Sequence, residues 1–126
     1  MHLFLIIGLV TALDLAHIYF FRESYEVNIK KITNSSAPIS YNFKYVIAAY
    51  LCIATIIYML YLMSKATKFS HKNILIAAVL GVCVFGIYNF TNAATLKNYS
   101  NRIAIHDTLW GGLLLGFAGA MFEYTK

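Results

Sequence analysis

Four apolar runs, each about as long as a membrane-spanning helix, constrain this chain more than any other feature of its sequence. They cover roughly residues 3–21, 43–63, 73–96 and 103–122. A helix needs about 20 apolar residues to cross a bilayer core of about 30 Å, and each run meets that length. Hydrophobic residues make up 60% of the 126 residues and charged residues only 12%. These values are typical of an integral membrane protein and not of a soluble domain.

The connectors between the runs predict how the helices are arranged. Residues 64–72 and 97–101 are short connectors, which make consecutive helices antiparallel neighbours. Residues 22–42 form the longest connector and are polar. We therefore predict an all-α fold with a single transmembrane domain over residues 1–126, built as an antiparallel up-down four-helix bundle. The first run has no basic segment before it, so we expect a retained helix and not a cleaved signal.

The basic residues predict contact with lipid and an orientation in the membrane. The formal net charge is +5, but the cations lie at the ends of the apolar runs instead of forming one stripe, so no nucleic-acid partner is expected. One membrane side receives Arg22, Lys30, Lys31, Lys44, Lys97 and Arg102, and the other receives Lys65, Lys68, Lys72 and Lys126. The excess of basic residues belongs inside, which predicts both termini on the non-cytoplasmic side.

Small residues recur at four-residue spacing in two of the runs. The first run carries Gly8, Ala12 and Ala16, and the fourth carries Gly112, Gly116 and Ala120. Lipid provides no hydrophobic drive between helices, so close packing through small residues is the usual source of association. We predict that these positions are helix-packing surfaces. Whether one of them contacts a second copy of the chain or a larger membrane complex is left open.

Polar residues deep in the apolar runs are the candidate site. Asp14 is the most informative, because a carboxyl group in the middle of a membrane helix costs about 2.5–3.5 kcal/mol on insertion scales. In an up-down bundle, the end of the first helix, the end of the third and the start of the fourth lie toward one leaflet. The polar residues in those parts are Asp14, His17, Tyr88, Asn89, Thr91, Asn92, Thr95, Asp107 and Trp110. We expect them to form one intramembrane polar cluster.

Simpler interpretations stay open for several of these residues. Asp107 could be a first-turn residue stabilised by the helix dipole. The asparagines and threonines could join helices by hydrogen bonds. Asp14, His17, His106 and Asp107 could be ligands of a metal or haem, but adjacent residues point about 100° apart on a helix, so His106 and Asp107 do not easily bind one ion. We expect no metal site and no cofactor.

The polar residues also carry a resemblance to a known family. The sequence has a Leu-Asp pair in the first helix, then Tyr-x-x-Thr-Asn-x-Ala-Thr-Leu, and then Asp-x-x-Trp-Gly. This pattern is similar to that of the predicted membrane proteins catalogued as domain of unknown function 2177. The matching residues are Leu13, Asp14, Tyr88, Thr91, Asn92, Ala94, Thr95, Leu96, Asp107, Trp110 and Gly111. The chain departs from the pattern at His17, where the family commonly has Trp, and at Tyr99-Ser100, where an aromatic-proline pair is common.

The resemblance implies a four-helix membrane fold and an important set of residues, Asp14, Asn92, Asp107 and Trp110, but no activity. Three functions are therefore compared. A structural or assembly component of a membrane, with an internal hydrogen-bond network that fixes the bundle, is the first. A proton or small-solute pathway with titrating carboxyl groups is the second. A membrane-embedded enzyme that uses paired acids on a lipid substrate is the third.

Overall fold

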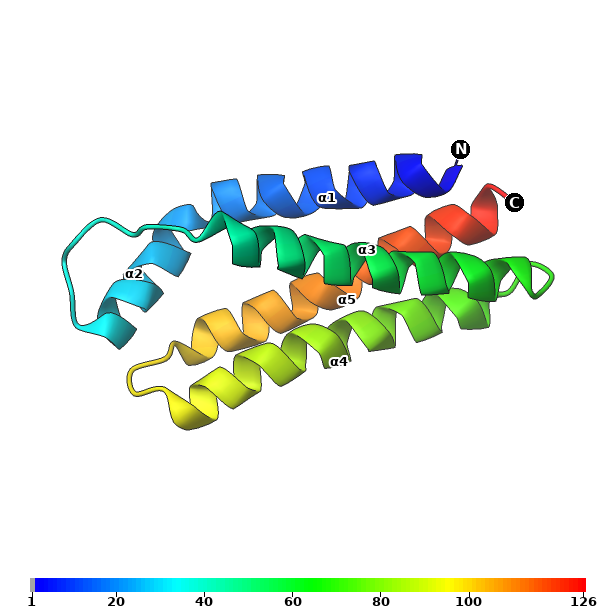
Figure 1. Cartoon of the computed structure of the whole chain (residues 1–126). Coiled ribbons are helices and arrows are strands. Elements are labelled where there is room, and N and C mark those ends of the chain that lie inside the picture. The colour runs from blue at the N-terminus through cyan, green and yellow to red at the C-terminus, as the bar shows by residue number, and fades with distance from the viewer. Residues whose placement is uncertain (1) are drawn as a thin grey trace.

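The computed structural model describes residues 2–126, and all its regular secondary structure over that range is helical. Its helices are α1 (His2–Phe20), α2 (Arg22–Thr33), α3 (Phe43–Lys65), α4 (His71–Thr95) and α5 (Asn101–Tyr124). Four of them, all except α2, are long and apolar enough to cross a membrane. The predicted all-α fold with four candidate membrane spans is confirmed. In Figure 1 both termini lie at one end of the molecule, and α2 and the α4–α5 connection lie at the other.

Helix α2 lies inside the stretch that the sequence pattern assigned to a polar connector. It is too short and too polar to cross a membrane. Glu23 in its first turn and Lys30 and Lys31 in its last turn complement the helix dipole. It ends at Asn34, which adopts the left-handed conformation with φ 50° and donates its N–H to the carbonyl of Lys30. The chain therefore turns at the end of α1 and places a second, polar helix beside the bundle.

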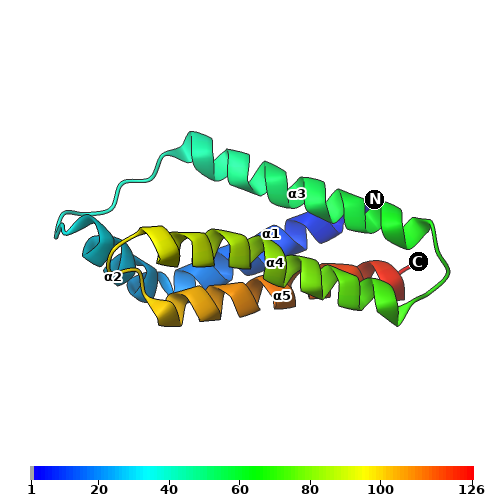
Figure 2. The same ribbon diagram turned by 90° about the horizontal axis from the view of Figure 1, so that it is seen from below.

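Helices α4 and α5 form a tightly packed hairpin, visible side by side in both views (Figures 1 and 2). Glycines allow this close approach. A Cβ atom added at Gly81 would overlap the carbonyl oxygen of Gly111, and one added at Gly112 would lie 2.6 Å from Cγ2 of Val82. One added at Gly119 would lie 2.6 Å from Cβ of Ala77. Packing through small residues therefore joins these two helices along most of their length.

The two predicted small-residue surfaces differ in burial: the one on α5 packs against α4, and the one on α1 is exposed. Gly112 is buried against α4, Gly116 faces it with Ala78 Cβ 3.2 Å from an added Cβ, and Ala120 is partly buried. In α1 the corresponding residues are exposed, and a Cβ added at Gly8 would have nothing within 4 Å. Helix α1 instead turns Ile6, Val10, Asp14 and His17 inward. A packing contact for Gly8, Ala12 and Ala16 stays a prediction.

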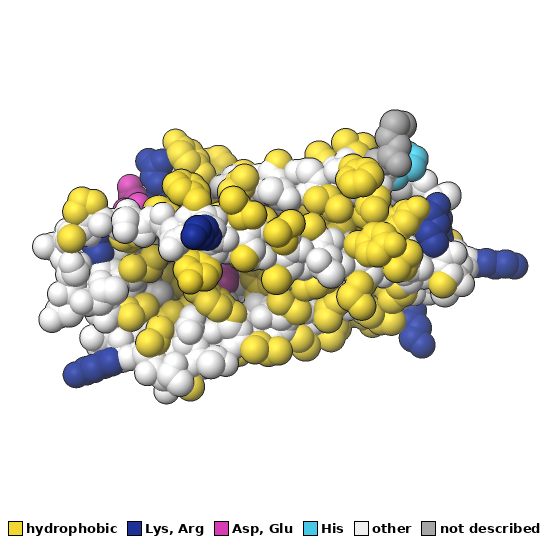
Figure 3. Space-filling view, viewed as in Figure 1, with side chains coloured by type: hydrophobic (Ala, Val, Ile, Leu, Met, Phe, Trp, Pro, Cys, Tyr) yellow, Lys and Arg dark blue, Asp and Glu magenta, His cyan; other side chains and the backbone are white. Residues whose placement is uncertain are grey.

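The outer surface is apolar over the middle of the molecule. Space-filling atoms in Figure 3 show hydrophobic side chains across the visible face, with Lys and Arg gathered toward the two ends. Large apolar side chains such as Leu51, Met59 and Leu113 are more than 60% exposed within the chain. A soluble domain seldom exposes so much contiguous apolar surface, whereas a bilayer covers it.

Candidate functional site

Asp14 lies inside the bundle with both carboxyl oxygens paired. Its side chain is 6% exposed. Trp110 Nε1 donates to Oδ1 at 2.9 Å, and the Tyr50 hydroxyl donates to Oδ2 at 2.8 Å. The three residues come from α1, α5 and α3, so one carboxyl group joins three membrane helices. This pairing offsets the cost of placing the group in the apolar region.

Asp107 has a second pair of donors. The Tyr25 hydroxyl, from α2, donates to Oδ1 at 2.9 Å, and Asn89 Nδ2 donates to Oδ2. Asn89 is completely buried, and its amide also donates to the Phe85 carbonyl at 2.9 Å and accepts from the Tyr99 hydroxyl at 2.8 Å. Asp107 and Asn89 therefore connect α2, α4, α5 and the α4–α5 loop.

His17 lies between the two carboxyl centres. Its ring stacks on Trp110 with centroids 4.1 Å apart and an angle of 3° between the planes. Its Nε2 lies 3.0 Å from Nε2 of His106, so one of the two rings donates the proton of that hydrogen bond. Its Nδ1 is buried and has no hydrogen-bond partner among residues 2–126. The ring thus joins the Asp14 side of the network to the surface at His106, which is exposed.

The structure brings five of the nine predicted cluster residues into direct hydrogen-bonded or stacked contact: Asp14, His17, Asn89, Asp107 and Trp110. Asn92 is partly buried and lies about one helical turn from Asn89, on the same side of α4. Tyr88 is 63% exposed, and Thr91 and Thr95 are also exposed, with the Thr95 hydroxyl donating to the Thr91 carbonyl. These three residues lie on the outer face of α4, one helical step away from the face of Asn89 and Asn92.

Three tyrosines that the sequence pattern did not assign to the network complete it: Tyr25, Tyr50 and Tyr99. In the sequence they resemble the many tyrosines near the ends of membrane helices, which ordinarily lie at headgroup depth. Burial, and then the neighbouring Asp107, raise the pKa of Tyr25 well above its usual range. Burial likewise raises the pKa of Tyr99. Both therefore remain protonated hydrogen-bond donors over the ordinary pH range.

One comparison with known proteins identifies the family of the chain. A family model described as predicted membrane protein (DUF2177) matches residues 1–123, nearly the whole chain. The chain belongs to this family. The resemblance seen in the sequence is therefore confirmed, and the chain is a predicted membrane protein with four candidate spans. No curated protein and no solved structure matches it.

The opposite end of the molecule holds a second polar cluster, which the sequence pattern did not predict. Glu123 is 2% exposed and accepts hydrogen bonds from the Ser70 N–H and from Asn73 Nδ2, both at 2.8 Å. Lys126 pairs with its Oε2 at 2.9 Å and donates to the Ser64 carbonyl. These contacts hold the start of α4 and the end of α3 against the end of α5. An acidic residue at a helix C-terminus opposes the dipole, which is the signal that could have identified it.

The chemistry of the main cluster is that of hydrogen bonding between carboxyl, indole, phenol, amide and imidazole groups. No group of three or more His, Cys, Asp or Glu side chains able to hold a metal ion occurs among residues 2–126. A cleft of about 400 Å³ lies next to the cluster and shares Tyr25 and His106 with it. Neither Asp14 nor Asp107 is among the residues that line the cleft.

Proposed function

We propose that the protein is a structural or assembly component of its membrane, in which the polar network fixes how the helices pack. One observation carries the proposal: each of the four oxygens of Asp14 and Asp107 accepts a hydrogen bond, and the donors Trp110, Tyr50, Tyr25 and Asn89 come from α5, α3, α2 and α4. A satisfied buried network favours one arrangement of helices over others. The rigid bundle then presents a constant apolar surface to lipid or to other membrane proteins.

The same proposal includes an orientation. Six of the ten Lys and Arg residues lie at the end that carries α2. The excess of basic residues supports a cytoplasmic position for α2 and for the α4–α5 loop, with both termini on the other side. A homo-oligomer or a larger membrane complex is the expected setting, since the small-residue stripe of α1 is exposed in the single chain.

Substitution of Asp14 tests the structural role. In Asp14→Asn the amide oxygen still accepts from Trp110, and the Tyr50 hydroxyl can rotate to accept from the amide nitrogen. We expect its free energy of unfolding in detergent to stay within about 1 kcal/mol of the wild type. Asp14→Leu leaves both donors unpaired and should lose about 2–4 kcal/mol. Equal stability of all three proteins would contradict a structural network.

A proton pathway is the second candidate, because His17 and His106 link the region beside Asp14 to the cleft at the protein surface. Its test uses the same variants in lipid vesicles with a pH gradient and an enclosed pH-sensitive dye. The structural proposal predicts that the wild type and Asp14→Asn both leak protons at the rate of empty vesicles. Proton flux through the wild type that disappears in Asp14→Asn would overturn the structural proposal and favour the pathway.

A further inference from the structure

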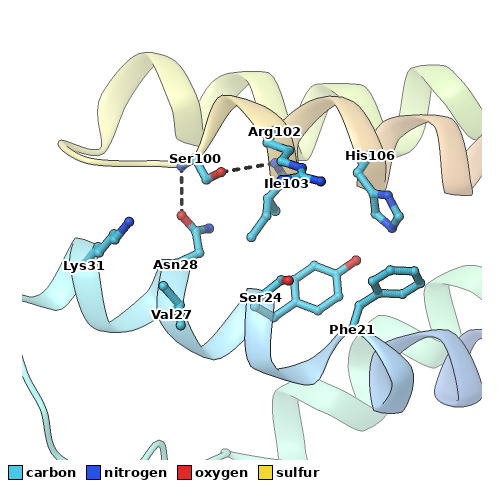
Figure 4. A pocket seen from close by; sticks show the side chains of 10 residues that line it. Phe21, Ser24, Val27, Asn28, Lys31, Ser100, Arg102, Ile103 and His106 are labelled. Carbon is cyan, nitrogen blue, oxygen red and sulfur yellow. Dashed lines mark hydrogen bonds between the residues drawn. The ribbon is translucent and has the colours of Figure 1, made fainter.

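The cleft lies between α2 and the first turns of α5, as Figure 4 shows. Its volume is about 400 Å³, within the range of small-ligand sites. Asn28 of α2 is 5% exposed, and its Oδ1 accepts from the backbone N–H of Ser100 at 2.8 Å. This bond ties α2 to the residue that precedes α5. The cleft is therefore bounded by two helices that are fixed to each other.

The polar lining of the cleft favours an anion. Lys31 and Arg102 contribute one positive charge each, His106 lies at one side, and none of the ten lining residues is acidic. The Asn28 amide nitrogen makes no hydrogen bond within residues 2–126, and in Figure 4 it lies on the Arg102 side of the residue. The positive end of the α5 dipole lies at the same place. In Figure 4 Arg102 lies on one side of the Asn28–Ser100 hydrogen bond and Lys31 on the other. A phosphate group on the Arg102 side would find a cation, an amide donor and a helix N-terminus, with the second cation across that bond.

The apolar lining and the depth of the cleft favour a lipid over a free anion. Phe21, Val27 and Ile103 line it beside the cations. Helix α1 ends at Phe20 and α5 begins at Asn101, so the cleft lies where two membrane spans end. That is the depth of lipid headgroups, where amphipathic helices such as α2 ordinarily lie. Free phosphate would gain nothing from the apolar side chains.

We propose that this cleft binds the phosphate headgroup of an anionic phospholipid. Arg102 contacts the phosphate, Lys31 adds a second positive charge in the same cleft, and Phe21, Val27 and Ile103 contact the first carbons of the acyl chains. Basic pockets between membrane helices on the cytoplasmic side are suited to anionic lipids, which are concentrated in that leaflet. The site adjoins the polar network, since Tyr25 and His106 belong to both, but its two cations take no part in the hydrogen bonds of Asp14 and Asp107.

The full-length protein in a mild detergent tests the site by native mass spectrometry, titrated with phosphatidylglycerol or with phosphatidylcholine. The double variant Lys31→Gln/Arg102→Gln removes both cations from the cleft. The matched control is Arg22→Gln/Lys30→Gln, which removes the same charge from the same side of the protein without touching the cleft lining. Inorganic phosphate at about 10 mM is added as the competitor that separates a lipid site from a phosphate site.

We expect one phosphatidylglycerol per chain, bound at least about tenfold more tightly than phosphatidylcholine. The cleft variant should lose about 30-fold in affinity for phosphatidylglycerol, because each cation near an anionic lipid contributes about fivefold. The control variant should lose less than about threefold. If the double variant unfolds, Arg102→Gln alone should lose about fivefold. Equal binding of both lipids, an equal loss in the control, or displacement of the lipid by inorganic phosphate would overturn the proposal.

Discussion

The close contact between α4 and α5 at Gly81 predicts a strong effect of a single added methyl group. In Gly81→Ala the new Cβ would overlap the Gly111 carbonyl oxygen and lie 2.7 Å from the Gly111 carbonyl carbon and 3.1 Å from the Gly112 Cα. All three atoms belong to the backbone of α5. Rotation of a side chain therefore cannot relieve the contact, and the two helices have to move apart.

The magnitude follows from the size of that movement. Ordinary Cβ contacts begin at 3.4 Å, so α4 and α5 must separate by more than about 1 Å, which removes about half or more of the dispersion energy of each atom pair at the contact. Overpacking of this kind costs about 1–3 kcal/mol. The gain in helix propensity from Gly to Ala offsets up to about 1 kcal/mol of the loss. We expect Gly81→Ala to lower the free energy of unfolding by about 2 kcal/mol.

Unfolding by a denaturing detergent, followed by the fluorescence of Trp110, measures the effect. Trp110 is the single tryptophan of the chain, and it stacks on His17 in the polar network, so its emission reports the packing of the bundle. Gly86→Ala, in the same helix, is the control, because the nearest atoms to its new Cβ lie at ordinary contact distances of 3.4 Å or more, and it should gain up to about 1 kcal/mol. If Gly81→Ala is as stable as Gly86→Ala, the helices do not approach closely at Gly81.

Two further predictions concern the buried Glu123 and the raised pKa of Tyr25. Glu123→Gln should lose about 2 kcal/mol of unfolding free energy in the same assay, because the carboxyl group accepts two hydrogen bonds from the start of α4 and pairs with Lys126. The control Glu23→Gln changes an exposed residue of α2 and should lose less than about 0.5 kcal/mol. Equal losses in the two variants would contradict a stabilising role of buried Glu123. The wild type should become less stable as the pH rises above about 10, because burial and Asp107 make Tyr25 harder to ionise in the folded state than in the unfolded state. Tyr25→Phe should show a shallower decrease, and parallel pH curves would refute this reasoning.

The membrane spans could be predicted because their length is a requirement of the bilayer and is read directly from composition. Helix α2 could not be predicted in this way, because its twelve mostly polar residues have neither the length nor the hydropathy of a span. Its position depends on tertiary contacts, such as the hydrogen bond between Asn28 and the Ser100 N–H, that connect residues 72 positions apart. The pattern of apolar residues therefore predicts which segments enter the membrane better than it predicts which segments lie at the membrane surface.

The residues of the candidate site could be predicted where burying the side chain in the membrane costs much free energy, and not where it costs little. Asp14 in an apolar helix requires partners, so its contact with another polar residue follows from the sequence alone. Tyr50 could not be identified as a partner, because a tyrosine is stable at many depths and gives no such signal. The depth of a side chain in the membrane was also easier to predict than the direction in which it points. Tyr88 lies in the predicted part of α4 but faces outward, because the sequence does not fix the rotation of α4 about its axis.

The hydrogen bond between Asp14 and Trp110 has a consequence for how the chain is made. The two residues are 96 positions apart, so α1 enters the membrane long before its partner has been synthesised. At about 5–20 residues per second, the ribosome needs about 5–20 s to reach Trp110. Until then the Asp14 carboxyl has at most the Tyr50 hydroxyl of α3 as a donor, because lipid offers none. A nascent chain stopped before α5 would therefore keep the Oδ1 oxygen of this acid unpaired in the membrane.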